Sequence, residues 1–374
     1  MILTTYNSID KVQWKNLVDC SAVATWFQTE EAYNFYASMP AIMQPFIFAV
    51  KSGEQLKGII IGYITQADSK LKQYFTRRAI IIGGPLLAND ITDNELNELL
   101  QTTYKQLARK AIYIETRNFN DYSRWKNAFE KNGFTYKPHL NFHVDTGSMD
   151  IVNSHLGKNR KRDIRVSFRD GADIIVNPTL NQVKVYYSIL KQLYTTKVKT
   201  PLFEWEFFEK LFSLPSAHFL LVEFQEQIIG GTVCVELAGR TLYEWFVCGK
   251  DGKYKNIFPS EVATFAGLQY ATEHSCTRFD MMGAGTPEEA YGVRDFKARF
   301  GGELVEHGRF IRINNSTLYQ LGSLGVKLLK INRGGVIVDY QPYSLIIIYH
   351  KDIIIIADNG VFACIYTSNI YVKN

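Results

Sequence analysis

The segment from Phe279 to Gly302 reads FDMMGAGTPEEAYGVRDFKARFGG. The pattern predicts a short apolar strand, a glycine-rich turn, a polar loop, and a short amphipathic helix that ends at Gly301 and Gly302. Glycine reaches positive φ without a Cβ clash, so a double glycine can stop a helix. A strand that opens into a turn of this kind predicts a binding or catalytic site, although an ordinary strand-to-helix crossover is the alternative.

Two halves of the chain share one pattern, and the Phe279–Gly302 segment lies late in the second half. Each half has a hairpin whose second strand opens with a glycine, and the four strands are expected at Phe46–Lys51, Lys57–Thr65, Phe219–Glu226 and Gln227–Glu236. Each half then continues with a strand, a helix that ends in glycine, and a long strand. The sequence therefore predicts two copies of one α/β unit, joined near Thr146–Asp150.

We expect the first domain to cover residues 1–146 and the second to cover residues 147–315. Residues 316–374 follow as a C-terminal helix and an isoleucine-rich tail, to which we assign no role. Within the two domains, long strands are expected over Phe134–Val144 and Glu303–Ile313, and one continuous basic helix over Asp150–Arg169.

The composition is that of an ordinary globular protein of 374 residues, with 46% hydrophobic and 21% charged residues and a net charge of +5. Its five cysteines form no Cys-x-x-Cys pair, which favours a reduced, cytoplasmic setting. We expect no secretory signal at the N-terminus, and no apolar run is long enough to predict a membrane span.

Basic residues are concentrated in the predicted helix that follows the first domain. They are Lys158, Arg160, Lys161, Arg162, Arg165 and Arg169. Arg162, Arg165 and Arg169 share a helix face. Such a face suits the phosphates of RNA or of a pyrophosphate-bearing substrate because guanidinium groups match phosphate oxygens. A solvated helix surface is the alternative for any charge cluster of this kind.

Aromatic residues form a second group, at the end of the third strand of the second unit. Tyr243 and Trp245 can line a cleft for an extended peptide or a base, or they can pack in the core. Tyr254, in a polar loop, is the stronger candidate for a substrate contact.

The opening segment contributes the residues best suited to chemistry. Asp280 ends a strand, where α/β sheets usually bind ligands. Lys297 lies in the helix beside Phe296 and can stabilise an oxyanion on an acyl carbonyl, with a surface salt bridge as the alternative. Arg294 can bind phosphate.

Other chemical templates do not fit the sequence. His139 and His143 are four residues apart but fall in a strand pattern, so they do not share a helix face for a metal. The sequence contains neither the glycine-lysine phosphate loop nor the Gly-x-Ser-x-Gly nucleophile turn. We therefore expect neither a metal nor a bound cofactor.

These features resemble the FemAB-like family of peptidoglycan-bridge aminoacyltransferases. The resemblance covers roughly residues 1–315 and is strongest in the basic helix start, Lys158–Arg165, and in Phe279–Gly302. Gly83-Gly84-Pro85 in the first unit also fits. The resemblance implies two tandem GNAT-like domains, each a mixed, mostly antiparallel sheet flanked by helices.

The resemblance also implies a reaction. Family members move an aminoacyl ester from tRNA to an amine of a cell-wall precursor peptide, without a metal or bound cofactor. The family's Phe-Lys pair corresponds to Phe296 and Lys297, and the lysine is expected to stabilise the tetrahedral intermediate. A base must still take the ammonium proton, and Asp280 or Asp295 is the candidate.

The implied partners are aminoacyl-tRNA as the donor and a lipid-linked or nucleotide-linked peptidoglycan precursor as the acceptor, with possible peripheral contact at the inner membrane face. The candidate substrate-binding residues are Arg162, Arg165, Tyr243, Tyr254 and Arg294. The first unit lacks the Phe-Lys pair, so we expect the chemistry to be confined to the second unit.

One departure keeps two other functions open. The best-known family members carry a long helical-hairpin arm in the second unit, and Leu180–Leu214 predicts only two modest helices. The alternatives are an acyl-CoA-dependent N-acyltransferase and a non-catalytic binder of RNA or of an anionic precursor. Against the first, Gly249–Tyr254 does not fit the glycine turn that usually holds the coenzyme's pyrophosphate.

Overall fold

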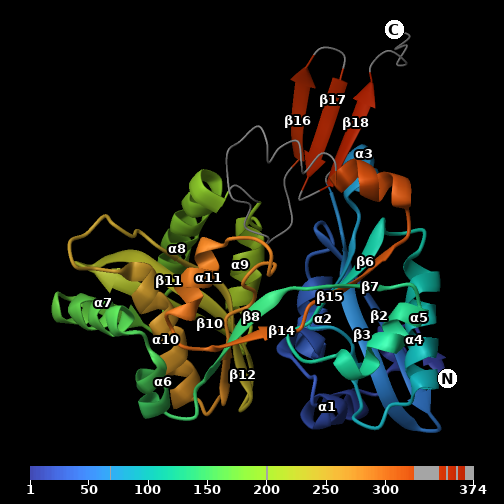
Figure 1. The fold of residues 1–374 in the computed structure, drawn as a ribbon, viewed down its shortest axis with the longest axis horizontal. Coiled ribbons are helices and arrows are strands. Elements are labelled where there is room, and N and C mark those ends of the chain that lie inside the picture. Colours follow the sequence, from blue (N-terminus) through green and yellow to red (C-terminus); the bar gives the residue numbers. More distant parts are fainter. Residues whose placement is uncertain (68, 199–200, 324–344, 351–352, 359–360, 367–374) are drawn as a thin grey trace. The chain divides into compact units, whose positions relative to one another are not determined.

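The computed structural model describes residues 1–67, 69–198, 201–323, 345–350, 353–358 and 361–366 (Figure 1). The chain divides into two compact units. The first is built mainly from Met1–Lys137 and the chain from Gly308 onward, and the second mainly from Pro138–Lys199 and Phe203–His307.

The first unit contains an eight-stranded sheet in the order β1-β2-β3-β4-β6-β15-β7, with β5 paired to β3. The strands are β1 (Ile2–Leu3), β2 (Met43–Ser52), β3 (Gln55–Thr65), β4 (Ala79–Ile82), β5 (Leu86–Leu87), β6 (Tyr113–Arg117), β7 (Thr135–Lys137) and β15 (Arg309–Ile313). The helices are α1 (Lys11–Cys20), α2 (Glu30–Ala37), α3 (Lys70–Thr76), α4 (Asp93–Leu107) and α5 (Lys126–Lys131). α4 is amphipathic, because Leu96, Leu99 and Leu100 of one face are buried in the core of this unit.

The second unit contains a seven-stranded sheet in the order β14-β8-β13-β12-β11-β10-β9. The strands are β8 (Leu140–Asp145), β9 (Ala172–Ile175), β10 (Ala217–Phe224), β11 (Gln227–Leu237), β12 (Thr241–Gly249), β13 (Arg278–Asp280) and β14 (Glu303–Glu306). The helices are α6 (Met149–His155), α7 (Lys158–Arg169), α8 (Leu180–Leu193), α9 (Trp205–Phe212), α10 (Pro259–Glu273) and α11 (Gly292–Ala298).

The two sheets share a topology, as the repeated hairpins predict. The hairpins are β2–β3 in the first sheet and β10–β11 in the second, and both are antiparallel. Each sheet also has a parallel pair, which is β4–β6 in the first and β12–β13 in the second. In Figure 1 helices flank each sheet. The expected mixed, mostly antiparallel architecture is confirmed.

Both expected long strands are wrong as single elements. Phe134–Val144 divides into β7, in the first sheet, and β8, in the second, because Pro138 has no N–H to continue a ladder. Glu303–Ile313 divides into β14, in the second sheet, and β15, in the first, at Gly308, whose φ is +62°. A Cβ at Gly308 would lie 2.3 Å from the Tyr136 ring, so only glycine fits this turn.

The expected continuous helix over Asp150–Arg169 is also two helices. α6 ends at His155 and α7 begins at Lys158. The N–H of Gly157 donates to the carbonyl of Arg299 at 3.0 Å instead of continuing the helical ladder. The break between α6 and α7 therefore allows Gly157 to bind Arg299, the residue that follows α11.

Near the C-terminus, residues 316–323 are helical. Three strands, β16 (Leu345–His350), β17 (Ile353–Asp358) and β18 (Val361–Tyr366), form a separate antiparallel sheet in the order β16-β17-β18. The isoleucine-rich tail therefore contributes these three strands, and residues 324–344 lie outside the described part of the chain.

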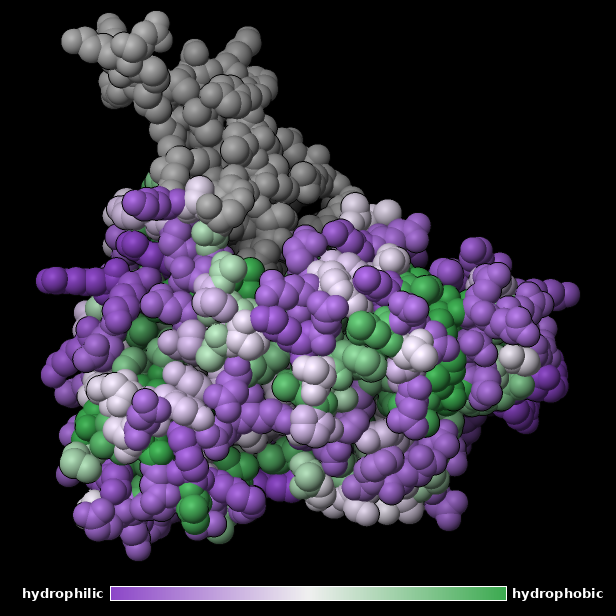
Figure 2. All heavy atoms as spheres, turned by 180° about the vertical axis from the view of Figure 1, so that it is seen from behind, coloured by the Kyte–Doolittle hydropathy of each residue, from purple (hydrophilic) through white to green (hydrophobic). Residues whose placement is uncertain are grey.

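None of the helices in the described residues has both the length and the apolar character that a membrane span requires. The face drawn in Figure 2 is mostly hydrophilic, with apolar residues in small separate groups.

Candidate active site

The candidate site begins where two parallel strands part. β12 and β13 pair from Thr241 with Arg278 to Tyr243 with Asp280, and β12 then continues to Gly249 with β11 as its partner. The chain leaves β13 through a turn in which Met282 and two glycines have positive φ. Where backbone carbonyls of such a turn are not paired with a neighbouring strand, they need other hydrogen-bond donors when they are buried.

Lys297 and Arg294 of α11 supply those partners. The Nζ of Lys297, which is 7% exposed, donates to the carbonyls of Met281 and Gly283, the latter at 2.6 Å. The Nε of Arg294, one turn earlier, donates to the carbonyl of Ala284 at 2.9 Å, and its Nη2 donates to that of Thr286. Two cationic side chains therefore fasten the turn to the helix.

Two buried carboxylates lie near the Lys297 ammonium. Burial lowers the pKa of Lys297 to about 8, and the charges of Glu244 and Asp280 act against that shift. Glu244 is 3% exposed, and burial raises its pKa although the charge of Lys297 and the nearby Thr264 hydroxyl oppose the rise. A lysine with this pKa is partly deprotonated near neutral pH, whereas a lysine of ordinary pKa is almost fully protonated there.

Asp280 is fully buried and is held by three partners. Its Oδ1 accepts hydrogen bonds from the Asn141 side chain at 2.7 Å and from the Met282 N–H at 2.8 Å. Its Oδ2 lies 3.1 Å from Nε2 of His143. Burial alone would raise the pKa of Asp280, but His143, Arg278 and Asn141 outweigh it and hold the pKa below its ordinary value.

Asn141 and His143 were not expected at the site. They lie in β8, which pairs with β13 so that His143 faces Asp280 across the ladder. The sequence separates His143 and Asp280 by well over a hundred residues, and only the strand pairing brings them together. The alternation of β8, with Phe142 and Val144 in the apolar core, is the one signal that places Asn141 and His143 on the opposite face.

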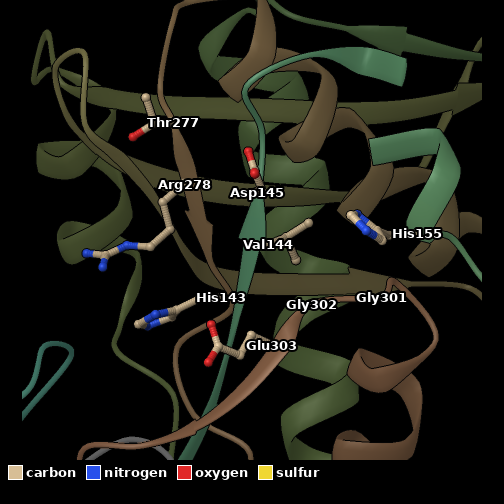
Figure 3. A pocket seen from close by; sticks show the side chains of 9 residues that line it. All are labelled: His143, Val144, Asp145, His155, Thr277, Arg278, Gly301, Gly302 and Glu303. Atoms are coloured by element: carbon tan, nitrogen blue, oxygen red, sulfur yellow. The ribbon is translucent and has the colours of Figure 1, made fainter. Parts of the chain in front are cut away.

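A hollow of roughly 550 Å³ opens beside this carboxylate–imidazole pair (Figure 3). Its lining combines acidic, basic and neutral groups, namely His143, Val144, Asp145, His155, Thr277, Arg278, Gly301, Gly302 and Glu303. Figure 3 shows the side chains of His143 and Glu303 next to each other, as their cross-strand pairing requires. Among the residues that the structure describes, no cluster of histidine, cysteine and acidic side chains is suited to hold a metal.

Phe296 is held in place by a buried arginine from α7. The Arg160 guanidinium lies 4.6 Å from the Phe296 ring centroid and 4.5 Å from that of Phe300, in cation–π contact with both. It also forms an ion pair with Glu261 of α10. Burial and the charge of Arg299 lower the pKa of Arg160 to about 10. The sequence assigned Arg160 only to the basic cluster, and the structure places it in the packing between three helices.

The remaining candidate residues differ in exposure. Arg162 and Arg165 are exposed on α7, and Arg162 pairs with the adjacent Asp163 at 2.8 Å. Tyr254 is half-buried and packs edge-on against Phe224.

Tyr243 is fully buried, and burial raises its pKa to about 12. Arg278 and Asp280 also act on the pKa of this residue. The structure therefore gathers Asp280, Arg294, Lys297 and Tyr243 around the end of β13. Arg162 and Arg165 lie instead on α7, and Tyr254 lies in the loop after β12.

Comparison with known proteins finds that part of this chain is similar to one protein family. Residues 220–342 match the sequence profile of the FemAB family, a range that contains Glu244, Asp280 and Lys297. A lipid II:glycine glycyltransferase of Staphylococcus saprophyticus is 30% identical over 121 residues, which is 31% of this chain. The chain covers 28% of that relative's length.

Solved structures extend the likeness of the fold to most of the chain. FemX has a TM-score of 0.66 at 14% identity, with 85% of this chain and 99% of FemX covered. The C-terminal domain of a putative lysylphosphatidylglycerol synthetase from Agrobacterium fabrum has a TM-score of 0.55 at 12% identity, with coverage of 89% and 100%. A tandem GNAT protein from the clavulanic acid biosynthesis pathway has a TM-score of 0.50 at 10% identity, with coverage of 84% and 99%.

The fold and the site thus define a protein with two tandem GNAT-like units, of which the second carries the candidate site. Within that class, residues 220–342 resemble the FemAB family.

The buried ammonium predicts a pH-dependent stability. Because the folded protein releases the Lys297 proton near pH 8 and an unfolded chain near 10.5, the unfolded state binds more protons between these values. The free energy of unfolding should therefore rise with pH across this window in the wild type and not in Lys297→Met. Urea unfolding from pH 7 to 10.5 measures the difference. Lys210→Met, at a half-buried lysine of α9 outside the site, serves as the control and should follow the wild type. A Lys297→Met curve parallel to that of the wild type would contradict the pKa assigned to Lys297.

The Arg160 contacts predict a large loss of stability on substitution. Arg160→Leu leaves Glu261 without its cation and removes both ring contacts, so the free energy of unfolding should fall by about 3–5 kcal/mol. Arg162→Ala, on the exposed face of the same helix, should change it by less than about 0.5 kcal/mol. Adding Glu261→Leu to Arg160→Leu should recover part of the loss. Equal effects of the Arg160 and Arg162 variants would refute the structural role of Arg160.

Proposed function

We propose that this chain is a FemAB-like N-acyltransferase that moves an aminoacyl group from aminoacyl-tRNA to an amine of a peptidoglycan precursor peptide. The observation that carries the proposal is the position of Lys297, a buried lysine of lowered pKa that lies within the FemAB-matching residues and beside two carboxylates. The relative named lipid II:glycine glycyltransferase supports a cell-wall precursor as the acceptor.

The chemistry requires little beyond positioning and charge stabilisation. An aminoacyl ester is already activated, so holding an amine against its carbonyl supplies much of the rate. An ammonium group has three N–H donors, and two of those of Lys297 bind carbonyls of the turn. We propose that the third stabilises the oxyanion of the tetrahedral intermediate, with Phe296 holding the helix and Asp280 serving the proton transfer.

Exposed basic residues on α7 support a polyanionic donor. Lys158, Lys161 and Arg165 lie on its solvent-exposed side. The loop that carries Lys253 and Lys255 is fastened to the same helix, because the Asn256 side chain donates to Asp170 at 3.0 Å. We propose that this surface, with Arg162, binds tRNA phosphates, and that Tyr243, Tyr254 and Arg294 act nearer the acceptor.

An acyl-CoA donor is the second candidate, and one contact disfavours it. The pyrophosphate of the coenzyme would need the free N–H groups at a helix N-terminus. The corresponding helix in this unit is α10. The carboxylate of Asp251 already binds there, because its Oδ1 accepts from the N–H of Ser260 at 3.0 Å. A phosphate at this position would meet a negative charge. α8 and α9 have only 14 and 8 residues and do not form the long helical-hairpin arm of the best-known family members. Binding of tRNA is therefore tested directly.

The proposed acceptor also sets the proposed location. A lipid-linked precursor lies at the inner face of the membrane, so we propose that the protein works in the cytoplasm with peripheral membrane contact. The proposal needs no metal and no bound cofactor, because the donor ester carries the activation.

Lys297→Ala should lower acyl transfer by about 10²-fold or more, because it removes the oxyanion donor. The assay incubates the protein with a mixed pool of charged tRNAs and a precursor peptide, and mass spectrometry measures the product. Lys210→Ala, a surface lysine of the same unit, should retain full activity. Circular dichroism checks that both variants fold, and a folded Lys297→Ala variant with wild-type transfer would remove the role assigned to this residue.

The donor can be identified by binding. Charge reversal at Lys161 and Arg165 should weaken tRNA binding and reduce its dependence on salt concentration by roughly one phosphate contact for each residue. Lys15→Glu, on an exposed helix of the first unit, is the matched control. Acetyl-CoA should not raise the melting temperature at saturating concentration. Stabilisation by acetyl-CoA together with salt-independent tRNA binding would favour the second candidate.

A further inference from the structure

The imidazole of His143 joins a buried carboxylate to an open hollow. Its Nε2 lies 3.1 Å from Oδ2 of Asp280, which is fully buried, while the His143 side chain is 11% exposed and lines the hollow. Asp280 therefore has no direct route to a bound substrate, whereas His143 has one. Asp280 also lies close enough to Lys297 for its charge to act on that ammonium, so the histidine and the lysine share one carboxylate.

The groups around His143 carry both signs of charge. Asp280 and Arg278 face it from β13, Glu303 is its cross-strand partner on β14, and the His307 ring centroid lies 5.3 Å away. Asp145 lines the same hollow from β8. Two carboxylates attract an ammonium group, and a guanidinium binds a carboxylate. The lining thus suits a ligand that has a primary amine and a carboxylate.

We propose that this hollow binds the acceptor and that His143 takes the proton from its ammonium group, with Asp280 as the positioning residue behind the imidazole. The inference rests on the proposed acyl transfer and names the acceptor subsite and its base. Glu303 and Asp145 attract the ammonium, and Arg278 binds the carboxylate of the same acceptor.

The step balances as follows in atoms and charge. The ammonium gives one proton to His143, and the lone pair of the resulting amine forms a bond to the ester carbonyl carbon. When the tetrahedral intermediate collapses, the bond from carbon to the ribose oxygen breaks. The second proton of the attacking nitrogen passes to that leaving oxygen. The products are an amide and a free ribose hydroxyl, and His143 releases its proton to solvent.

Asp280 is a poor base by comparison. Its Oδ1 already accepts two hydrogen bonds, and its environment favours the ionised form. A carboxylate held in this way orients an imidazole and stabilises the imidazolium, as in other carboxylate–histidine pairs.

The test compares two carboxylate–histidine pairs of the same unit. His143→Ala should lower kcat by about 10²-fold or more, and imidazole added to the buffer should restore part of the activity. The rate in the wild type should rise with pH through an ionisation that this variant lacks. His218→Ala breaks the other pair, with Glu236 at 2.8 Å, outside the hollow, and should retain wild-type activity and pH dependence.

Two probe acceptors test the subsite. Nα-acetyl-lysine carries an amine and a carboxylate, and N-acetylcadaverine is the same amine without the carboxylate. Arg278→Gln should raise KM about tenfold or more for the first probe and leave KM for the second unchanged. Because Arg278 also acts on Asp280, any change in kcat should be the same for both probes.

The outcomes separate the two proposals. A wild type that transfers no acyl group to any amine overturns the proposed function. A wild type that transfers, with a folded His143→Ala variant of unchanged rate and pH profile, overturns only the role of His143. An equal change in KM for both probes in Arg278→Gln overturns the carboxylate subsite.

Discussion

The buried ammonium of Lys297 is the interaction on which the candidate site depends. A charge removed from water costs several kcal/mol unless other groups compensate it. In the second unit, two backbone carbonyls bind this ammonium, and Glu244 and Asp280 lie near enough to act on it. The same contacts fasten the turn after β13 to α11, so one side chain serves both the local fold and the proposed chemistry. A polar group with both duties tolerates little substitution.

The second constraint is the exchange of strands between the two halves of the chain. β8 follows β7 closely in sequence but lies in the other sheet, and β14 and β15 repeat the exchange near the end of the second half. Asn141 and His143, which hold Asp280, therefore come from chain that precedes residue 147. The expected boundary after residue 146 remains a prediction, but a second domain that began there would lack Asn141 and His143, two of the three partners of Asp280.

Local patterns predicted much of the architecture. The two hairpins, the amphipathic α4 and the glycine stop after α11 follow from periodicity and from glycine chemistry, which act within a few residues. The errors share one cause. At Pro138, Gly157 and Gly308 the chain changes partner, and the partner is distant in sequence. A continuous apolar pattern does not reveal that its two ends lie in different sheets.

The sequence by itself determined the class of protein and pointed to Lys297, because the residues of the Phe279–Gly302 segment are contiguous and their pattern is specific. The tertiary structure alone decided what surrounds that lysine. It paired His143 with Asp280, and it placed Arg160 against Phe296 inside the packing. Burial and charge pairing depend on which strands and helices become neighbours, and that choice is made by long-range packing, which no local pattern encodes.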